Sequence, residues 1–195
     1  MAGRLRDRGG SHAFFVGLTL LACGLEAFHR ALFPRLVYLR AGILRGEAWR
    51  LLSGHLVHAG PLHLAWNLAG LVIVWIAFGP RLSGRGWLLA SLASGVGAGL
   101  GVLVLEPRVG AMAGLSGLLH GLMAAGAVAA VRSGERLGWL FLAVLAAKIA
   151  WEQTVGPNPA TQAALGGAIA VGSHLYGTAS GLLAGLLLRP RPLPR

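Results

Sequence analysis

Residues 51–80 read LLSGHLVHAGPLHLAWNLAGLVIVWIAFGP and contain no Asp, Glu, Lys or Arg. About 20 helical residues cross the hydrocarbon core of a bilayer, so this run is long enough to span it. Other charge-free stretches of at least this helical length lie at residues 86–105, 109–131 and 153–188. Of the 195 residues, 55% are hydrophobic and 12% are charged, and this charged share is about half of that in a soluble domain. The sequence therefore predicts an integral membrane protein.

The apolar runs predict an all-α bundle of six membrane helices in one domain that covers residues 1–195. We expect helices at residues 13–32, 56–79, 87–105, 112–131, 137–155 and 164–188. Pro157 and Pro159 interrupt the last charge-free stretch, because proline lacks a backbone donor and clashes with the preceding helical turn. The first loop, residues 30–55, mixes arginines with apolar residues, and we expect it to lie as a hairpin in the outer headgroup layer.

The basic residues are distributed as topology signals. The chain has 17 Lys and Arg residues against 6 Asp and Glu, a formal net charge of +11. Between apolar helices, such arginines are typical of orientation signals and lipid headgroup contacts, and we expect no nucleic-acid partner. With the N-terminus inside, ten arginines fall in cytoplasmic segments and six on the opposite side. This bias predicts that both termini are cytoplasmic.

The composition excludes several kinds of membrane-embedded catalytic site. An aspartyl protease needs two embedded Asp residues, and the only Asp is Asp7 near the N-terminus. The sequence has no His-Glu-x-x-His zinc motif, and a single cysteine, Cys23, forms neither an internal disulfide nor a metal cluster. We therefore expect no metal and no cofactor. The chemistry that remains is a hydroxyl nucleophile with a histidine base.

Polar side chains gather near one end of three predicted helices. With the N-terminus inside, the helices at 56–79, 112–131 and 164–188 all begin on the outer side, so their polar residues share one depth. These residues are His55, His58, His63, Asn67, Ser116, His120 and His174. Polar groups within a membrane span are unfavourable, so such a cluster indicates a functional site.

Ser116 and His174 are the candidate nucleophile and base. Gly114 and Gly117 flank the serine, so its Oγ is exposed and another backbone can approach. Small residues at helical spacing predict close packing of the two helices: Gly177, Gly181 and Gly185 follow His174, and Gly117, Gly121 and Ala125 follow Ser116. Two alternatives stay open. In the first, His120, one turn beyond the serine, is the base in place of His174. In the second, Ser116 is not a nucleophile, and its hydroxyl only bonds a carbonyl of its own helix.

A tetrahedral intermediate also requires hydrogen-bond donors for its oxyanion. His63 and Asn67 are four residues apart and share one helical face. Together with the backbone N–H of Ser116, they are the candidate donors. The alternative is that the ring and the amide only satisfy one another inside the bundle.

Two charged pairs have structural interpretations. Glu47 and Arg50 are three residues apart in the first loop and are expected to hold its fold. Lys148 and Glu152 are four residues apart in the helix at 137–155, where each lowers the cost of the other in the membrane. We assign this second pair no chemical role.

Together these residues resemble the rhomboid family of intramembrane serine proteases. The resemblance runs in order through Trp49-Arg50, His58-x4-His63-x3-Asn67, Gly114-x-Ser116-Gly117 and His174-x2-Gly177-x3-Gly181. It implies that Ser116 is the nucleophile, His174 the base, and His63 with Asn67 the oxyanion donors. It also implies single-pass transmembrane proteins as substrates and no carboxylate behind the histidine. The supporting positions are Glu47, Trp49, Arg50, His58, Gly114, Gly117, His120, Gly177 and Gly181.

Within that family, the chain is similar to the rhombosortases, the compact six-helix bacterial branch. The similar stretches are residues 46–58, 114–121, 151–153 and 173–177. This resemblance implies processing of exported proteins whose C-terminal tail has a Gly-Gly motif, one transmembrane helix and a basic cluster. It also implies a multi-pass protein of the bacterial inner membrane with its site open toward the periplasm. The alternatives are a rhomboid protease with other single-pass substrates and an inactive rhomboid-like protein that binds transmembrane helices.

Overall fold

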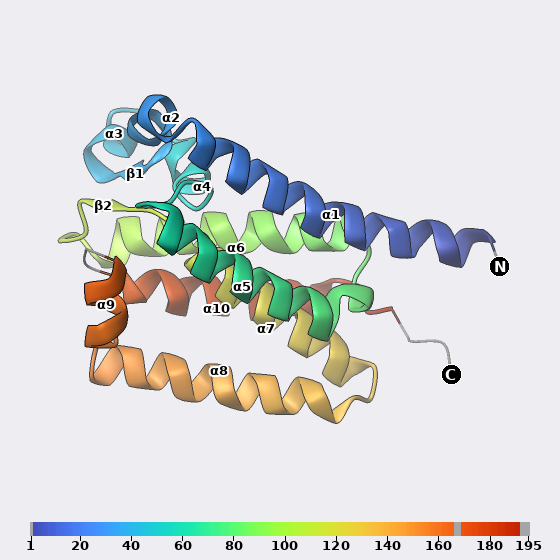
Figure 1. Cartoon of the computed structure of the whole chain (residues 1–195). Coiled ribbons are helices and arrows are strands. Elements are labelled where there is room, and N and C mark those ends of the chain that lie inside the picture. The colour runs from blue at the N-terminus through green and yellow to red at the C-terminus, as the bar shows by residue number, and fades with distance from the viewer. Residues whose placement is uncertain (1, 166–168, 192–195) are drawn as a thin grey trace.

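The long helices of the protein run side by side in a bundle (Figure 1). The computed structural model describes residues 2–165 and 169–191. The long helices are α1 (Ala2–Ala27), α5 (Pro61–Phe78), α6 (Gly84–Leu105), α7 (Ser116–Arg132), α8 (Arg136–Thr154) and α10 (Val171–Leu187). The start of α1 and the end of α10 lie at the same end of the bundle (Figure 1).

Most short elements lie at the opposite end of the bundle (Figure 1). They are α2 (His29–Leu36), β1 (Tyr38–Leu39), α3 (Arg40–Leu44), α4 (Arg50–Ser53), β2 (Ala111–Met112) and α9 (Pro159–Leu165), whereas the 3₁₀ helix η1 (Gly79–Arg81) connects α5 to α6. β1 and β2 form an antiparallel pair in which Tyr38 faces Met112 and Leu39 faces Ala111. This pair ties the first loop to the segment that precedes α7.

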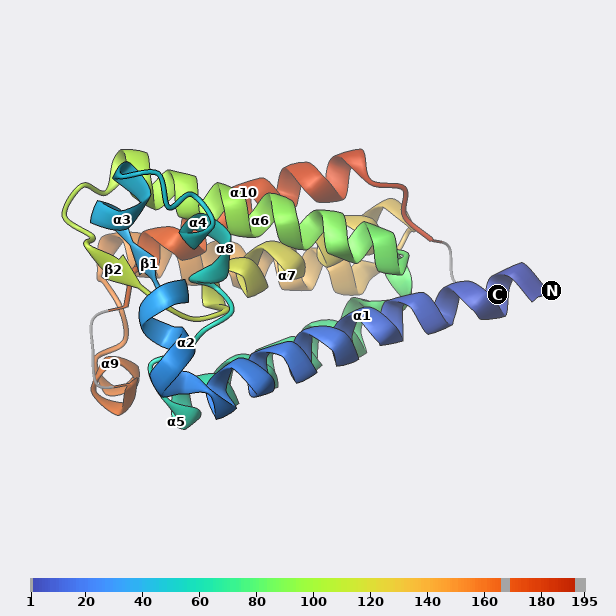
Figure 2. The same ribbon diagram turned by 90° about the horizontal axis from the view of Figure 1, so that it is seen from above.

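α7 lies in the middle of the bundle, with α5 on one side and α10 on the other (Figure 2). Its buried residues are mainly Gly and Ala, which let neighbouring backbones approach closely. A Cβ at Gly177 would overlap the backbone of Gly117, and a Cβ at Gly181 would overlap that of Gly121. The glycine contacts predicted between these two helices are therefore confirmed.

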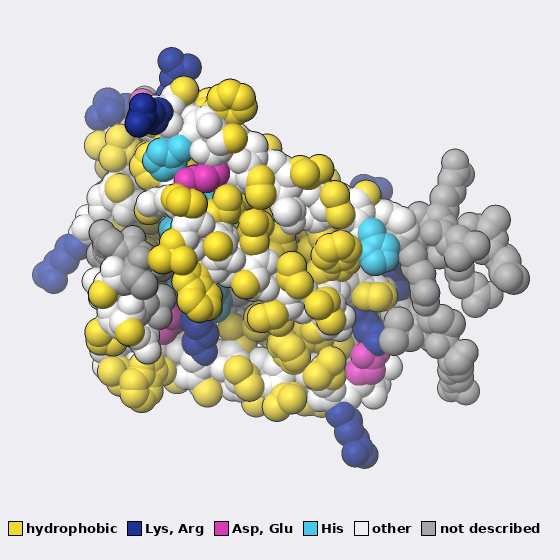
Figure 3. Space-filling view, in the orientation of Figure 1, with side chains coloured by type: hydrophobic (Ala, Val, Ile, Leu, Met, Phe, Trp, Pro, Cys, Tyr) yellow, Lys and Arg dark blue, Asp and Glu magenta, His cyan; other side chains and the backbone are white. Residues whose placement is uncertain are grey.

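Apolar side chains cover much of the face along the long helices, and charged side chains lie mostly toward its two ends (Figure 3). In residues 2–165 and 169–191, three helices are long and apolar enough to cross a membrane: Gly9–Ala27, Pro61–Arg81 and Gly84–Leu105. Ser116–Arg132 is apolar but shorter, and α8 contains the charged residues Arg136, Lys148 and Glu152. The chain is a mostly helical membrane protein with several apolar helices.

Glycines with left-handed backbone conformations shift two of the predicted helix starts. The helix predicted at 56–79 begins at Pro61, after Gly60 with φ 136°, so His55 and His58 precede it instead of lying on it. The helix predicted at 112–131 begins at Ser116, after Gly114 with φ 110°. Such φ values favour glycine and end regular helical hydrogen bonding. Ser116 is therefore the first residue of its helix.

Three other predictions were wrong in detail. The helix predicted at 13–32 is divided, because α1 ends at Ala27 and α2 begins at His29. The helix predicted at 164–188 begins at Val171, after the separate helix α9, and its predicted residues 166–168 lie outside the described ranges. The first loop is not a hairpin, because its strand β1 pairs with the distant β2.

Candidate active site

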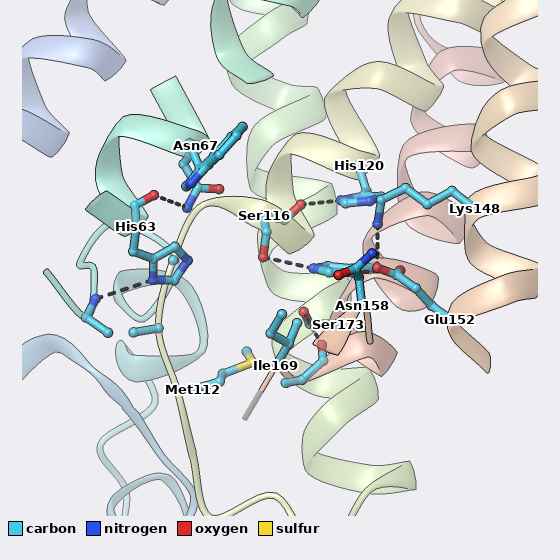
Figure 4. Close-up of a pocket in the computed structure, with 16 residues that line it drawn as sticks. His63, Asn67, Met112, Ser116, His120, Lys148, Glu152, Asn158, Ile169 and Ser173 are labelled. Carbon is cyan, nitrogen blue, oxygen red and sulfur yellow. Dashed lines mark hydrogen bonds and ion pairs between the residues drawn. The ribbon is translucent and has the colours of Figure 1, made fainter. Parts of the chain in front are cut away.

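A cavity of about 320 Å³ lies among α5, α7, α8 and α10, at the end of the bundle that carries β1, β2 and α9. Its polar side chains converge from all four helices (Figure 4). The helices contribute His63 and Asn67 from α5, Ser116 and His120 from α7, Lys148 and Glu152 from α8, and Ser173 and His174 from α10, and Asn158 adds a polar side chain from the segment before α9. The structure therefore brings together five of the seven polar residues that the sequence placed at one depth, and α8 adds two more, whereas His55 and His58 do not line the cavity.

Ser116 and His174 face one another inside the cavity. The Ser116 Oγ lies 3.0 Å from the Nε2 of His174, and His174 is buried. α7 and α10 approach closely here because Gly117 has no side chain. A Cβ at Gly117 would lie only 3.0 Å from the carbonyl oxygen of Ser173. A hydroxyl that donates to an unprotonated imidazole nitrogen has the geometry that a general base requires.

Gly114 leaves room beside the serine. Its φ of 110° lies in the left-handed region, and its N–H donates to the carbonyl oxygen of Gly54 at 3.1 Å. A Cβ at this position would lie 2.5 Å from the Nε2 of His63 and 3.4 Å from the Nδ2 of Asn67. Glycine is therefore required both by the backbone conformation and by the two donor groups next to it.

His63 and Asn67 present donor groups toward this space. The Nδ1 of His63 accepts the N–H of Ala59 at 3.4 Å, so its proton resides on Nε2, the nitrogen beside Gly114. The side-chain Nδ2 of Asn67 donates to the carbonyl oxygen of His63 at 3.0 Å, and the amide carries a second N–H. The amide of Asn67 therefore bonds the backbone carbonyl of His63 and not its imidazole ring.

His120 bonds the backbone of the serine instead of its hydroxyl. The Nδ1 of His120 donates to the carbonyl oxygen of Ser116 at 2.6 Å. Its ring stacks on that of His174, with centroids 4.2 Å apart and planes 10° apart. The geometry thus places His174, not His120, at the serine Oγ, and leaves His120 as the flat surface against which His174 rests.

His58 supports the segment before the serine from the loop that precedes α5. Its Nε2 accepts the N–H of Leu115 at 3.5 Å, and its ring packs edge-on against His63 at 5.2 Å. Burial lowers the pKa of His58 to about 3, so the ring is neutral near pH 7 and keeps a lone pair for this contact. His55, also buried in that loop, bonds the carbonyl oxygen of Gly95 on α6 at 3.0 Å.

The first loop is held by a buried arginine. Arg50 forms the predicted ion pair with Glu47, and its Nη1 donates to the carbonyl oxygens of Val37 at 2.8 Å and Pro34 at 3.1 Å. The Nε1 of Trp49 donates to the carbonyl oxygen of Arg35 at 3.3 Å, at the exposed surface of the loop. Because this loop also carries β1, these bonds fix the partner strand of β2 and so the approach to α7.

The model of the rhomboid domain matches residues 45–191, which is well over half of the chain. The chain belongs to the rhomboid family. It is also similar to a Bacillus subtilis (strain 168) protein named "Putative rhomboid protease YdcA", with 35% identity over 81 residues. That match covers 42% of this chain and 41% of the relative, so it spans less than half of the relative's length. Rhomboid proteases in general cleave transmembrane substrates.

This rhomboid chain has a carboxylate behind the histidine, which corrects the expectation that there is none. Glu152 Oε2 lies 2.8 Å from the Nδ1 of His174, and its Oε1 lies 2.5 Å from the Nζ of Lys148. The pair on α8 that we assigned no chemical role therefore contacts the candidate base. The sequence did contain a signal: α8 runs opposite to α10, so a residue near its C-terminal end reaches the N-terminal end of α10.

The rhomboid cavity also contains a candidate cluster of metal-ligating atoms. Ligand atoms of His120, Glu152 and His174 lie within 4.8 Å of one another. Both nitrogens of His174 and both carboxylate oxygens of Glu152 already have hydrogen-bond partners in this arrangement. A metal ion here would have to replace the contact between His174 and either Ser116 or Glu152.

Some residues that line the cavity were not predicted as site residues from the sequence. Met112 comes from β2, Asn158 from the break between α8 and α9, and Ile169 from the segment before α10. Their positions depend on the path of loops and of a two-residue strand. The Pro157-Asn158-Pro159 break identified a turn, but gave no direction for its side chains.

Proposed function

We propose that this rhomboid protein is an intramembrane serine protease, with Ser116 as nucleophile and His174 as general base. The observation that carries the proposal is the 3.0 Å contact between the Ser116 Oγ and the His174 Nε2. The contact lies in a cavity at one end of a bundle of apolar helices. His174 is held there by an acceptor on its far nitrogen and by the stacked ring of His120.

The proposed reaction begins when the Ser116 Oγ attacks the carbonyl carbon of the scissile peptide bond and its proton passes to the Nε2 of His174. The carbonyl oxygen then carries a negative charge, which donors aimed at it stabilise. The Nε2–H of His63, the second amide N–H of Asn67 and the Ser116 N–H at the start of α7 are the proposed donors. The intermediate collapses as His174 protonates the departing amine, and water later releases the acyl group from Ser116.

We infer that α1, α5, α6, α7, α8 and α10 all cross the membrane of a bacterial cell, with both termini in the cytoplasm. The beginning of α1 and the end of α10 lie at the same end of the bundle (Figure 1), and the residues that line the cavity lie at the other end. The distribution of ten arginines against six in the sequence supports placing that end inside. The cavity then opens toward the periplasm of the inner membrane.

For the substrate, we propose the C-terminal tails of exported proteins, in which a Gly-Gly motif precedes one transmembrane helix and a basic cluster. The support is the similarity of residues 46–58, 114–121, 151–153 and 173–177 to rhombosortases. Glycine is a poor helix former, by about 1 kcal/mol per residue relative to alanine. A Gly-Gly pair near the outer membrane face is therefore easily extended into the strand-like form that a serine nucleophile attacks.

The test is cleavage of two reporter proteins in liposomes that contain the purified protein. One reporter has a tail of Gly-Gly, an apolar helix and a basic cluster, and the other has Leu-Leu in place of Gly-Gly. We expect cleavage of the first reporter by the wild-type protein and by Ser133→Ala, and no cleavage by Ser116→Ala. Ser133 is a matched control because it directly follows α7 and its Oγ donates to the carbonyl oxygen of Ala129 on that helix.

The outcomes separate the candidate functions. Equal cleavage of both reporters indicates a rhomboid protease with broader single-pass substrates. Cleavage that survives in Ser116→Ala contradicts the assignment of the nucleophile. A folded protein that binds the reporter but cleaves neither version indicates an inactive helix-binding protein.

A further inference from the structure

We propose that Glu152 is a positioning residue that orients His174, and that Lys148 fixes the orientation of Glu152. The inference rests on the proposed protease function and extends the serine and histidine to a chain of four side chains. Successive contacts along this chain are 3.0 Å from Ser116 Oγ to His174 Nε2, 2.8 Å from His174 Nδ1 to Glu152 Oε2, and 2.5 Å from Glu152 Oε1 to Lys148 Nζ.

The direction of each hydrogen bond follows from the chemistry of the groups. An ionised carboxylate only accepts, so the Nδ1 of His174 carries the proton that it donates to Glu152. The Nε2 of the neutral ring is then unprotonated and accepts the hydroxyl proton of Ser116. Glu152 thereby selects the one neutral tautomer of His174 that can act as a base toward the serine.

The contact between His174 and Glu152 is largely shielded from the surface. The side chains of His174 and Glu152 are only 6% and 11% exposed, whereas that of Lys148 is 46% exposed. The ring of His174 is also held on its face by His120, with a centroid distance of 4.2 Å. His120 therefore restricts the plane of the ring, and Glu152 restricts its rotation within that plane.

The same chain accounts for the charges during the proposed reaction. When the proton of Ser116 passes to Nε2, the ring of His174 carries a proton on each nitrogen and a positive charge. The carboxylate of Glu152, 2.8 Å from Nδ1, lies beside this charge and stabilises it. The Nε2 proton then passes to the departing amine as the peptide C–N bond breaks, and the ring returns to its starting tautomer.

Lys148 gives the proposal a specific consequence. An ammonium group only donates hydrogen bonds. In Glu152→Gln, the amide oxygen would therefore face Lys148 and the amide NH₂ would face the Nδ1 of His174. The NH₂ group forces Nδ1 to accept, which moves the ring proton to Nε2 and blocks the transfer from Ser116. Removal of Lys148 in the same protein lets the amide turn and restores the productive tautomer.

The experiment measures the second-order rate of fluorophosphonate labelling of the purified full-length protein in detergent. The variants are Glu152→Gln, Lys148→Met and the double variant, and the matched control is Glu135→Gln. Glu135 pairs with Arg81 between η1 and the start of α8, away from the cavity, so it reports the effect of removing a carboxylate from another ion pair.

We expect Glu152→Gln to label about 10⁴-fold more slowly than the wild type, as when the acid of a serine triad is replaced. We expect the double variant to label at least about tenfold faster than Glu152→Gln, and Glu135→Gln to keep the wild-type rate. A purely structural role for the Lys148–Glu152 pair predicts the reverse order, because the double variant then loses both partners. That reverse order, or a rate for Glu152→Gln within about threefold of the wild type, overturns the proposal.

Two further measurements keep the test decisive. If the wild type itself does not label, while Ser116→Ala and the wild type are equally folded, the proposed protease function fails and not merely the role of Glu152. If Glu152→Gln does not fold, nitrogen-15 NMR of the neutral wild-type protein identifies the protonated ring nitrogen of His174, with His174→Gln for assignment. A proton on Nδ1 with a strongly deshielded resonance supports the proposal, and a proton on Nε2 overturns it.

Discussion

Replacement of Gly181 by alanine tests whether the close approach of α7 and α10 positions the serine against the histidine. A Cβ at Gly181 would lie 2.5 Å from the Cα of Gly121, about 1 Å closer than ordinary contact between carbon atoms. The atoms that it meets belong to the backbone of α7 and cannot turn aside, so the two helices must separate. A separation of about 1 Å would lengthen the 3.0 Å contact between Ser116 and His174 beyond hydrogen-bonding distance.

We therefore expect Gly181→Ala to lower the rate of fluorophosphonate labelling by about 10²-fold, the typical result of a 1 Å misplacement at a reacting centre. The matched control is Gly17→Ala on α1, where a Cβ would meet nothing within 4 Å. The control should label at the wild-type rate, since alanine is the better helix former and no neighbour is displaced. A Gly181→Ala protein that labels as fast as the control would refute the argument that helix spacing sets the geometry of the site.

Four further predictions test other parts of the account. His120→Ala should lower the rate of reporter cleavage less than His174→Ala, because only His174 contacts the serine Oγ; the opposite order would make His120 the base. Gly114→Ala should abolish cleavage while Gly46→Ala does not, although both have positive φ, because only at Gly114 would a Cβ meet His63; equal activity of the two variants would contradict this. A chelator should leave cleavage unchanged, and zinc ions should inhibit by competing for His174 and Glu152; loss of activity with the chelator would indicate a required metal. His58→Gln should reduce the acid sensitivity of thermal unfolding between pH 7 and pH 5. In the unfolded chain His58 binds a proton near pH 6.5, whereas burial in the folded protein lowers its pKa to about 3. Protonation of the unfolded state between pH 7 and pH 5 therefore lowers the free energy of unfolding by about 2 kcal/mol. An unchanged pH dependence in the variant would contradict the role of burial.

The contact between Ser116 and His174 could be predicted because it depends on helical periodicity. Small residues at spacings of three and four define one face of each helix, and such faces pack closely whatever the surrounding loops do. The pair of Glu47 and Arg50 was predictable because the two residues are three apart in the sequence, in a turn where the N–H of Arg50 donates to the carbonyl oxygen of Glu47. The first contact follows from two matching helical faces and the second from the spacing within one turn.

The helix starts were less predictable, because single glycines decide them. Gly60 and Gly114 adopt positive φ values, and hydropathy gives no signal for such a turn within an apolar run. Consequently His58 lies in the loop before α5, although the helix predicted at 56–79 would have included it. The pairing of Tyr38 with Met112 joins segments more than 70 residues apart, and two-residue strands have no recognisable periodicity.

The role of Glu152 in the geometry was missed for a different reason. Its partner four residues earlier, Lys148, supplied a sufficient explanation for a charge within an apolar helix. That explanation considered only α8, whereas Glu152 also contacts His174 on α10. The C-terminal end of α8 and the N-terminal end of α10 lie at the same end of the bundle, so a comparison of predicted depths over all the helices would have joined the two residues.

The central claim is that Ser116 is a nucleophile activated by His174, and the most direct test is to locate the fluorophosphonate adduct by peptide mapping. The wild-type protein should carry a single adduct on Ser116, and His174→Ala should carry none under the same conditions. An adduct on any other residue would contradict the assignment. So would labelling of His174→Ala at the wild-type rate, because it would show a serine that reacts without the histidine.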